Sequence, residues 1–215
     1  MRKVIGTMLV ALAIVSAGAP RPAVGQATKE KGSAPPTEKA ADYYPLAVGT
    51  KWHYEIETGN GQKVPLVYQI EKLERIEGRE LARLEVIARG QKSPYTEHLH
   101  SDTAGVYRDR MHNLDLSPPL RLIKYPVKAG EHWNSEITVG GRKMKVEGTE
   151  GPAEEVQVPA GKYRAIPCSI VISDGKEQST NVFWFAPGVG IVKQKTNLGI
   201  RDVIMELTKF EAATP

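Results

Sequence analysis

One phrase occurs twice in the chain, and it constrains the possible folds more than any other feature. Residues 45–56 and residues 126–137 both read Pro-x-x-apolar-Gly-x-x-Trp-x-x-Glu-Ile. In each copy the glycine permits a tight turn, and the tryptophan three residues later opens a strand and offers a large side chain for burial. The phrase therefore predicts two similar halves that each begin with a turn, an aromatic anchor and a strand, with Trp52 and Trp133 as the anchors.

A second pair of phrases recurs at nearly the same spacing. Residues 102–108 read Asp-Thr-Ala-Gly-Val-Tyr-Arg, and residues 186–193 read Ala-Pro-Gly-Val-Gly-Ile-Val-Lys. Because both phrases place a turn and another strand at the same point of each half, we interpret the chain as a degenerate duplication. The expected pseudo-repeats are residues 45–125 and 126–210.

Alternation of apolar and polar residues dominates the chain from residue 51 onward. A period of two indicates strands, and turn dipeptides such as Glu77-Gly78 and Asp174-Gly175 separate them about every ten residues, as is typical of an antiparallel all-β domain. The expected strands are 51–58, 63–75, 80–89, 94–101, 105–110, 131–139, 142–150, 153–158, 162–173, 177–185, 190–196 and 201–210.

Two segments are open to other interpretations. Residues 71–87 have the Glu, Lys, Arg and Leu content of a helix, but Gly78 and the alternation before it favour a long hairpin. Residues 111–120 contain two prolines, an asparagine and an aspartate, so we expect them to form the connection between the two halves.

These observations predict an all-β fold in one domain, residues 42–212. The expected architecture is an antiparallel curved sheet, clam-like or an open barrel, built from two similar halves, because a twisted sheet of about a dozen strands tends to curl. Cys168 is the single cysteine, which excludes an intramolecular disulfide. It lies in an apolar run, so we expect a small buried side chain rather than a reactive thiol.

The first 25 residues have the pattern of an export signal. Arg2 and Lys3 precede an apolar run from Val4 to Ala19, and small residues follow. That run is too short for a comfortable membrane span, and no cysteine follows it to carry a lipid. Residues 26–41 have no large apolar side chain and predict a disordered linker. We expect a soluble periplasmic or extracellular protein without a lipid anchor or a stable membrane span after cleavage.

The formal net charge of +4 overstates the basicity of the mature chain. Arg2, Lys3 and Arg21 lie in or beside the export signal, and without these three the 29 basic residues become 26, against 25 acidic residues. A net charge of about +1 gives no basis for nucleic acid as a partner.

Two segments of the second half resemble a signature shared by a group of exported bacterial β-proteins that includes the TapB-like proteins. Residues 158–165 read Val-Pro-Ala-Gly-Lys-Tyr-Arg-Ala, and residues 183–193 read Phe-Trp-Phe-Ala-Pro-Gly-Val-Gly-Ile-Val-Lys. The segment from Tyr44 to Trp52 is also similar to the start of these proteins, so the resemblance covers about residues 43–210. It implies export and a β fold, and it carries over no catalytic residue.

His98 and His100 are the best candidates for a metal site. Two histidines at this spacing on a strand point to one face and could share a cation, with Asp102 or His112 as a third ligand. The alternative, in which both line the wet face of an edge strand, is favoured because nothing else in the chain has metal-ligand spacing. We therefore expect no metal and no other cofactor.

Catalytic motifs are weaker still. Ser173 and Lys176 match the Ser-x-x-Lys pair of acyl-transfer enzymes, but the Asp-Gly between them predicts a hairpin tip instead of the helix that this chemistry needs. The Gly-Val-Gly at 188–190 is not followed by the helical pattern of a dinucleotide-binding loop. No catalytic residue is assigned, and a hydrolase with an unrecognised carboxylate or histidine site remains an alternative function.

Aromatic side chains concentrate in the repeated phrases and in the Phe-Trp-Phe of residues 183–185. They indicate either a strand buried on both faces or a concave groove between the two halves. For the groove we name Tyr54, Tyr107 and Trp184 as candidate ligand-binding residues. The leading hypothesis is an exported non-enzymatic module that binds an apolar small molecule, a lipid or an envelope protein. A structural envelope scaffold is the other alternative.

The signal pattern generates a direct prediction about the mature N-terminus. Cleavage after the small residues that follow the apolar run should give a chain that starts between Gln26 and Thr28. N-terminal sequencing of exported protein measures this, and a chain that still begins at Met1 would contradict the cleavage.

Overall fold

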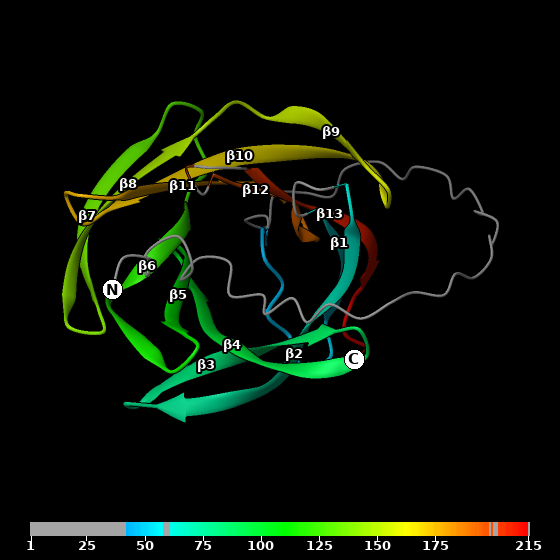
Figure 1. Cartoon of the computed structure of the whole chain (residues 1–215), viewed down its shortest axis with the longest axis horizontal. Coiled ribbons are helices and arrows are strands. Elements are labelled where there is room, and N and C mark those ends of the chain that lie inside the picture. Colours follow the sequence, from blue (N-terminus) through cyan, green and yellow to red (C-terminus); the bar gives the residue numbers. More distant parts are fainter. Residues whose placement is uncertain (1–41, 58–60, 198, 200–201, 215) are drawn as a thin grey trace.

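The described part of the chain folds almost entirely into strands. The structure is a computed structural model that describes residues 42–57, 61–197, 199 and 202–214, and within these residues it has thirteen strands and no helix (Figure 1). The predicted export signal and linker lie outside the described residues. No helix of the described part is long and apolar enough to cross a membrane.

The strands follow one another with short turns. They are β1 (Lys51–Glu57), β2 (Lys63–Ile76), β3 (Arg79–Ala88), β4 (Gln91–Asp102), β5 (Gly105–Met111), β6 (Leu114–Lys124), β7 (His132–Val139), β8 (Arg142–Glu150), β9 (Glu154–Val158), β10 (Gly161–Ser173), β11 (Gln178–Ala186), β12 (Gly190–Asn197) and β13 (Asp202–Glu211).

All strands belong to one antiparallel sheet that closes on itself. Its order is β11-β12-β13-β1-β2-β3-β4-β5-β6-β7-β8-β10-β9, and a further pairing of β11 with β10 joins the two ends (Figure 1). Twelve strands thus form a closed barrel, while β9 pairs with the first residues of β10 outside the ring. The prediction of an all-β, antiparallel curved sheet is confirmed, and closure leaves the twelve ring strands paired on both sides.

Twelve of the thirteen strands match predicted strands closely, and the long hairpin over residues 71–87 is confirmed as β2 and β3. The prediction that residues 111–120 are a connection is wrong, because residues 114–124 form β6. Prolines lack the N–H that a ladder needs, so they argue against a central strand. Here β6 tolerates Pro118 and Pro119 because it changes partner beside them.

The change of partner makes the contact between β6 and β7 the weakest in the barrel. Asp115 pairs with Arg110 of β5, Leu116 and Ser117 pair with β7, and pairing with β5 resumes at Leu120. The β6–β7 ladder therefore consists of two residue pairs, Leu116 with Val139 and Ser117 with Thr138. Beyond Ser117 the two strands are not paired with each other.

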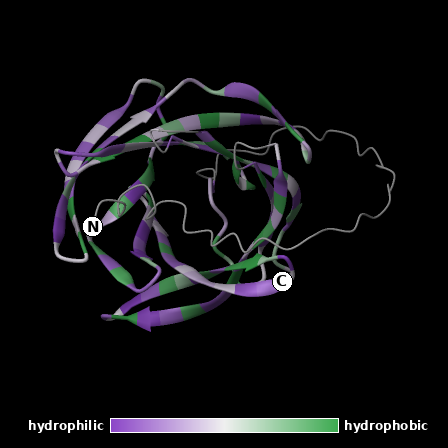
Figure 2. Cartoon of the chain, viewed as in Figure 1, coloured by the Kyte–Doolittle hydropathy of each residue, from purple (hydrophilic) through white to green (hydrophobic). Residues whose placement is uncertain are grey.

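Alternate side chains fill the inside of the barrel, as the period of two requires. Hydrophobic and hydrophilic residues alternate along the strands in Figure 2. On β1, Trp52, Tyr54 and Ile56 are buried, while their neighbours are partly or fully exposed. Cys168 is fully buried in the same core and unpaired, as expected from the sequence.

The two copies of the repeated phrase form turns with matching backbone hydrogen bonds. In the first, the N–H of Gly49 donates to the carbonyl of Ile70 (2.9 Å) and the N–H of Ile70 donates to the carbonyl of Thr50 (3.0 Å). In the second, Gly130 and Glu150 make the same bond at 2.7 Å, and the N–H of Glu150 donates to Glu131 at 2.9 Å. The internal duplication itself remains a prediction.

The two tryptophans after these turns are both buried in the core, as predicted, but their indole N–H groups differ. The exposed fraction is 0% for Trp52 and 8% for Trp133. Nε1 of Trp52 donates to the carbonyl of Val189 at 2.5 Å, whereas Nε1 of Trp133 is buried without a hydrogen-bond partner. Both rings pack directly against a glycine, where a side chain would collide with them. A Cβ atom added to Gly190 would lie 3.1 Å from Trp52 Nε1, and one added to Gly148 would lie 2.0 Å from the Trp133 ring.

This difference predicts unequal effects of matched substitutions. Trp52→Phe should lower the free energy of unfolding by about 1–2 kcal/mol more than Trp133→Phe, because it alone breaks a hydrogen bond and leaves a carbonyl without its partner. Truncation of either residue to Ala should cost roughly 3–5 kcal/mol. Urea unfolding followed by circular dichroism measures all four variants. Equal losses for the two Phe variants would show that the Trp52 hydrogen bond contributes nothing measurable.

Candidate functional site

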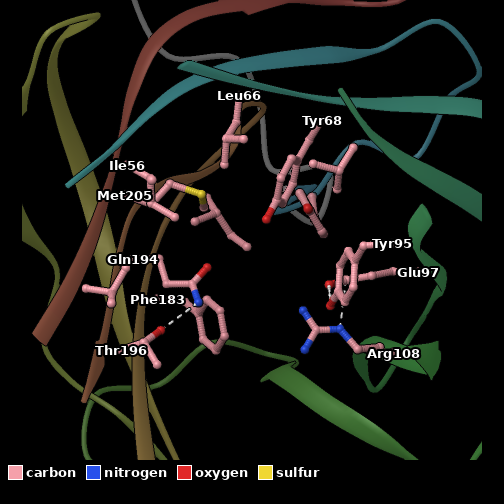
Figure 3. Close-up of a pocket in the computed structure, with 14 residues that line it drawn as sticks. Ile56, Leu66, Tyr68, Tyr95, Glu97, Arg108, Phe183, Gln194, Thr196 and Met205 are labelled. Atoms are coloured by element: carbon pink, nitrogen blue, oxygen red, sulfur yellow. Dashed lines mark hydrogen bonds and ion pairs between the residues drawn. The ribbon is translucent and has the colours of Figure 1, made fainter. Parts of the chain in front are cut away.

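A small cavity lies inside the barrel, lined by residues of both sequence halves. Its volume is about 40 Å³, enough for a few water molecules. The apolar part of its wall consists of Ile56, Leu66, Val86, Phe183, Ile191, Val203 and Met205 (Figure 3).

One side of this cavity carries a buried ion pair. Nε of Arg108 donates to Oε2 of Glu97 at 2.7 Å, and the hydroxyl of Tyr95 donates to Oε1 of the same carboxylate at 2.6 Å. All three side chains are at least nine-tenths buried. The terminal nitrogens of Arg108 point into the cavity in Figure 3, and no hydrogen bond from them occurs within the described residues. The pair therefore presents unused N–H donors to the cavity.

The opposite side carries neutral polar groups. Nε2 of Gln194 donates to the hydroxyl of Thr196 (3.0 Å), which in turn donates to the side-chain oxygen of Asn181 (2.7 Å). Gln194 faces Arg108 across the cavity in Figure 3. Asn181 itself does not line the cavity, and its Nδ2 is buried without a partner. Polar groups thus line two sides of an otherwise apolar lumen.

Burial changes the protonation equilibria around the cavity. Desolvation raises the pKa of Tyr68 and Tyr95 above the ordinary phenol value, and the negative charge of Glu97 adds to this. For Arg108, burial alone would lower the pKa, but the attraction of Glu97 outweighs it and the pKa is raised. Arg108 is therefore a permanent cation that Glu97 neutralises locally.

A β-bulge places these charges. His98 pairs with Arg110 and Leu99 pairs with Arg108, so Asp109 is the extra residue on β5. Strict alternation would put Arg108 and Arg110 on one face, whereas the bulge turns Arg110 away and lets Met111 enter the core. No pattern in the sequence indicates this bulge, and neither Glu97 nor Arg108 was predicted as a site residue.

A second pocket of about 340 Å³ lies on the barrel wall where β6 and β7 part. We call it the wall pocket, and it is lined by Arg79, His100, Asp102, Tyr107, Pro118, Pro119, Arg121, Trp133, Asn134 and Ser135. Its volume falls in the range of small-molecule sites. Like the lumen cavity, it is lined by residues on both sides of the boundary between the predicted halves.

His98 and His100 bind different carboxylates. Nε2 of His98 lies 2.7 Å from Oε2 of Glu74, and Nδ1 of His100 lies 2.5 Å from Oδ2 of Asp109. Within the described residues no group of three His, Cys, Asp or Glu side chains could hold a metal ion. A histidine engaged with its own carboxylate is occupied by a protein partner, so the structure does not assemble the shared cation site.

The three candidate ligand-binding residues are not brought together. Tyr54 is buried in the core and its hydroxyl donates to the carbonyl of Ile191 at 2.7 Å. Tyr107 lines the wall pocket. Trp184 lies on the opposite face of β11 from the two buried phenylalanines, and its Nε1 donates to Glu154 at 2.6 Å. A single groove lined by all three is therefore not formed, and any ligand contact of each stays a prediction.

Comparison with known proteins gives distant structural likeness. No family model and no curated protein matches the chain. A protein of Parabacteroides distasonis, provisionally named a lipoprotein, has 12% identity and a TM-score of 0.47 over 81% of this chain and 100% of its own. A protein of Bacteroides fragilis, provisionally named an exported protein with YmcC-like fold, has 14% identity and a TM-score of 0.47 over 80% and 100%.

The hypothetical lipoprotein YmcC of Escherichia coli is also similar, with 15% identity and a TM-score of 0.38 over 77% of this chain and 86% of its own. Likenesses at this distance transfer no function or site residue. None of these three proteins is named as TapB-like, so that part of the resemblance stays an expectation.

The carboxylate beside His98 generates a pH prediction. Hydrogen bonds from Lys72 and His98 lower the pKa of Glu74 to about 2. A group whose pKa is lower in the folded state stabilises the fold at pH values above its unfolded pKa, and this stabilisation is lost as the pH falls toward the folded pKa. Glu74→Gln should therefore lower the melting temperature at pH 7 and lose less stability than the parent protein between about pH 4.5 and 2. Glu80→Gln is the matched control, since Glu80 makes no ion pair among the described residues. Parallel melting curves for the parent and Glu74→Gln across this range would contradict the prediction.

Proposed function

We propose that this chain is a non-enzymatic binding module of the cell envelope whose barrel lumen holds a small, mainly apolar molecule with one neutral hydrogen-bond acceptor. The envelope assignment rests on the export pattern of the first 25 residues. The lumen assignment rests on one observation, the unused N–H donors that Arg108 directs into an apolar cavity.

The charge of the pair selects the class of ligand. Glu97 already neutralises Arg108 at 2.7 Å, so an anionic ligand would leave one buried negative charge without compensation. A carbonyl, ether or hydroxyl oxygen accepts from the guanidinium without adding charge. Hydrogen bonds to charged donors contribute about 1.5–3 kcal/mol, so such an oxygen gains more here than a methyl group of equal size.

The size of the cavity limits the ligand. A volume of about 40 Å³ accommodates a few non-hydrogen atoms as the side chains stand. A longer ligand requires displacement of wall residues, and Met205 is suited to this because an unbranched thioether adopts alternative rotamers at low cost. The lumen thus fits a short ligand directly and a longer one by rearrangement.

Short ketones test this proposal. 2-Pentanone should bind at least tenfold more tightly than n-pentane in a titration of the labelled protein followed by NMR, because it offers one acceptor to Arg108. The double variant Glu97→Gln with Arg108→Met should remove that preference and still fold, since replacing both members of a buried ion pair leaves no unpaired charge. Lys193→Met with Glu206→Gln is the matched control, because it removes a partly exposed pair with an N–O distance of 2.8 Å.

The outcomes separate the candidate functions. Equal ketone affinity in the parent protein and the lumen double variant would refute the role of Arg108. Native mass spectra of protein purified without denaturant would give the mass of a retained natural ligand. If neither ketone nor alkane binds and no ligand is retained, the scaffold alternative replaces the lumen-binding function.

One observation supports a hydrolase as the second candidate. His100 and Asp109 form a histidine–carboxylate pair, and Ser135 lines the same wall pocket. Such a pair activates a hydroxyl when the imidazole accepts its proton. Within the described residues no hydrogen bond joins Ser135 to His100, so the nucleophile is not in place, and the binding function is better supported.

A further inference from the structure

The wall pocket has a chemistry that the lumen does not share. It opens where the β6–β7 ladder stops after Ser117 and Thr138. Proline has no N–H to continue the ladder, so Pro118 and Pro119 keep the two strands from pairing further. The resulting space of about 340 Å³ is lined by residues of both strands and by residues of β3, β4 and β5.

One cation in this pocket has no anionic partner. Arg79 binds Oδ1 of Asp109 at 2.7 Å, and Asp102 accepts the backbone N–H groups of Ala104 and Gly105. Arg121, by contrast, makes no ion pair with any described carboxylate. Its Nε and Nη2 both donate to the neutral hydroxyl of Tyr107, at 3.1 and 2.9 Å. The positive charge of Arg121 is therefore available to a ligand.

The guanidinium is held in place before any ligand arrives. His100, Tyr107 and Arg121 are direct neighbours across β4, β5 and β6. The rings of His100 and Tyr107 stack with centroids 4.8 Å apart and planes within 8°. Asp109, almost fully buried, fixes His100 from behind. Because this row is already ordered, binding costs little additional conformational entropy at Arg121.

The facing strand contributes a different surface. Trp133 supplies an aromatic face, and Asn134 and Ser135 supply side chains that can donate hydrogen bonds. A ligand that spans the pocket therefore meets a cation on one side and an aromatic surface with polar neighbours on the other.

We propose that the wall pocket binds a carboxylate attached to a flat or apolar body, with Arg121 taking the carboxylate and Trp133 packing against the body. A guanidinium matches a carboxylate through parallel N–H donors, which a neutral amide cannot replace with equal strength. Two sources share this chemistry, a free aromatic or aliphatic acid and the C-terminus of a peptide. The wall pocket shares no lining residue with the lumen cavity, so this proposal does not depend on whether a neutral ligand binds in the lumen.

The experiment titrates the full mature chain with 3-phenylpropanoate and with 3-phenylpropanamide, followed by NMR. The acid should bind with a dissociation constant on the order of 1 mM or lower and perturb the indole resonance of Trp133. The amide should bind at least tenfold more weakly. N-acetyl-Ala-Ala-Phe with a free or amidated C-terminus tests the peptide source. Tighter binding of the free-acid peptide than of 3-phenylpropanoate assigns the site to a chain terminus, and the reverse order assigns it to a small acid.

Variants identify the residues. Arg121→Gln should weaken acid binding at least tenfold, while Tyr107→Phe, which keeps the ring stack but removes the hydroxyl that orients Arg121, should weaken it a few-fold. Arg164→Gln, an exposed arginine on β10, should leave it unchanged. Equal binding of acid and amide, unchanged affinity in Arg121→Gln, or no saturable binding of either acid up to about 10 mM would overturn the proposal.

Each variant is first checked for a melting temperature equal to that of the parent protein. If Arg121→Gln does not fold, Tyr107→Phe and the acid–amide comparison decide.

Discussion

The buried carboxylate of Glu150 holds the barrel together where its backbone pairing is weakest. Its two oxygens accept the backbone N–H groups of Lys124 and Lys128, each at 2.9 Å, and its side chain is fully buried. Burial raises the pKa of Glu150, and the two N–H donors oppose this by favouring the charged form. The carboxylate thus ties the connection between β6 and β7 to the end of β8. Without it, the β6–β7 ladder of two residue pairs would hold this connection only loosely.

The first half shows why this carboxylate is needed in the second. Ile70 occupies the position in the first turn that Glu150 occupies in the second, with the same backbone hydrogen bonds. In the first half, β1 is the counterpart of β7 and pairs with its preceding neighbour in the sheet, β13, along seven residues, so an apolar side chain suffices there. In the second half, β6 and β7 diverge, and the free N–H groups of the connection require an acceptor. The difference between Ile and Glu at these positions therefore follows from how complete the neighbouring ladder is.

The sequence determines most of the fold through local signals. Alternation and turn dipeptides locate twelve strands, because side-chain period and positive-φ turns are properties of a few neighbouring residues. Strand β6 was not predicted, because prolines normally exclude a central strand. The prolines are tolerated here because β6 changes its partner strand, and no local pattern reveals that change. Closure of the barrel is equally non-local, since β1 at the start of the domain pairs with β13 at its end.

The site residues were harder to predict for the same reason. His98 and His100 lie two apart, and simple alternation suggests a shared face and a shared ligand. In the structure each meets a carboxylate from another strand, Glu74 or Asp109. Likewise, the sequence alone does not distinguish Arg108 from a surface arginine, because its partner Glu97 lies on another strand and meets it only in the folded lumen. Pairings across strands, rather than residue types, decide which charged groups can act on a ligand.

Strand β5 supplies side chains to both pockets. Tyr107 faces the wall pocket and Arg108 faces the lumen, as alternation requires, while the bulged Asp109 turns its carboxylate toward His100 and Arg79. Buried ion pairs contribute little to stability compared with well-packed apolar residues, so stability alone does not account for Glu97 and Arg108 in the lumen. Their orientation toward an open cavity is the feature that a binding role explains. The same strand positions Arg121 through Tyr107 on the outside, where the side chain is partly exposed and its charge carries a smaller desolvation cost. In these two proposals, the barrel wall separates a site for a neutral acceptor from a site for an anion, and each arginine selects its ligand by how completely its charge is neutralised.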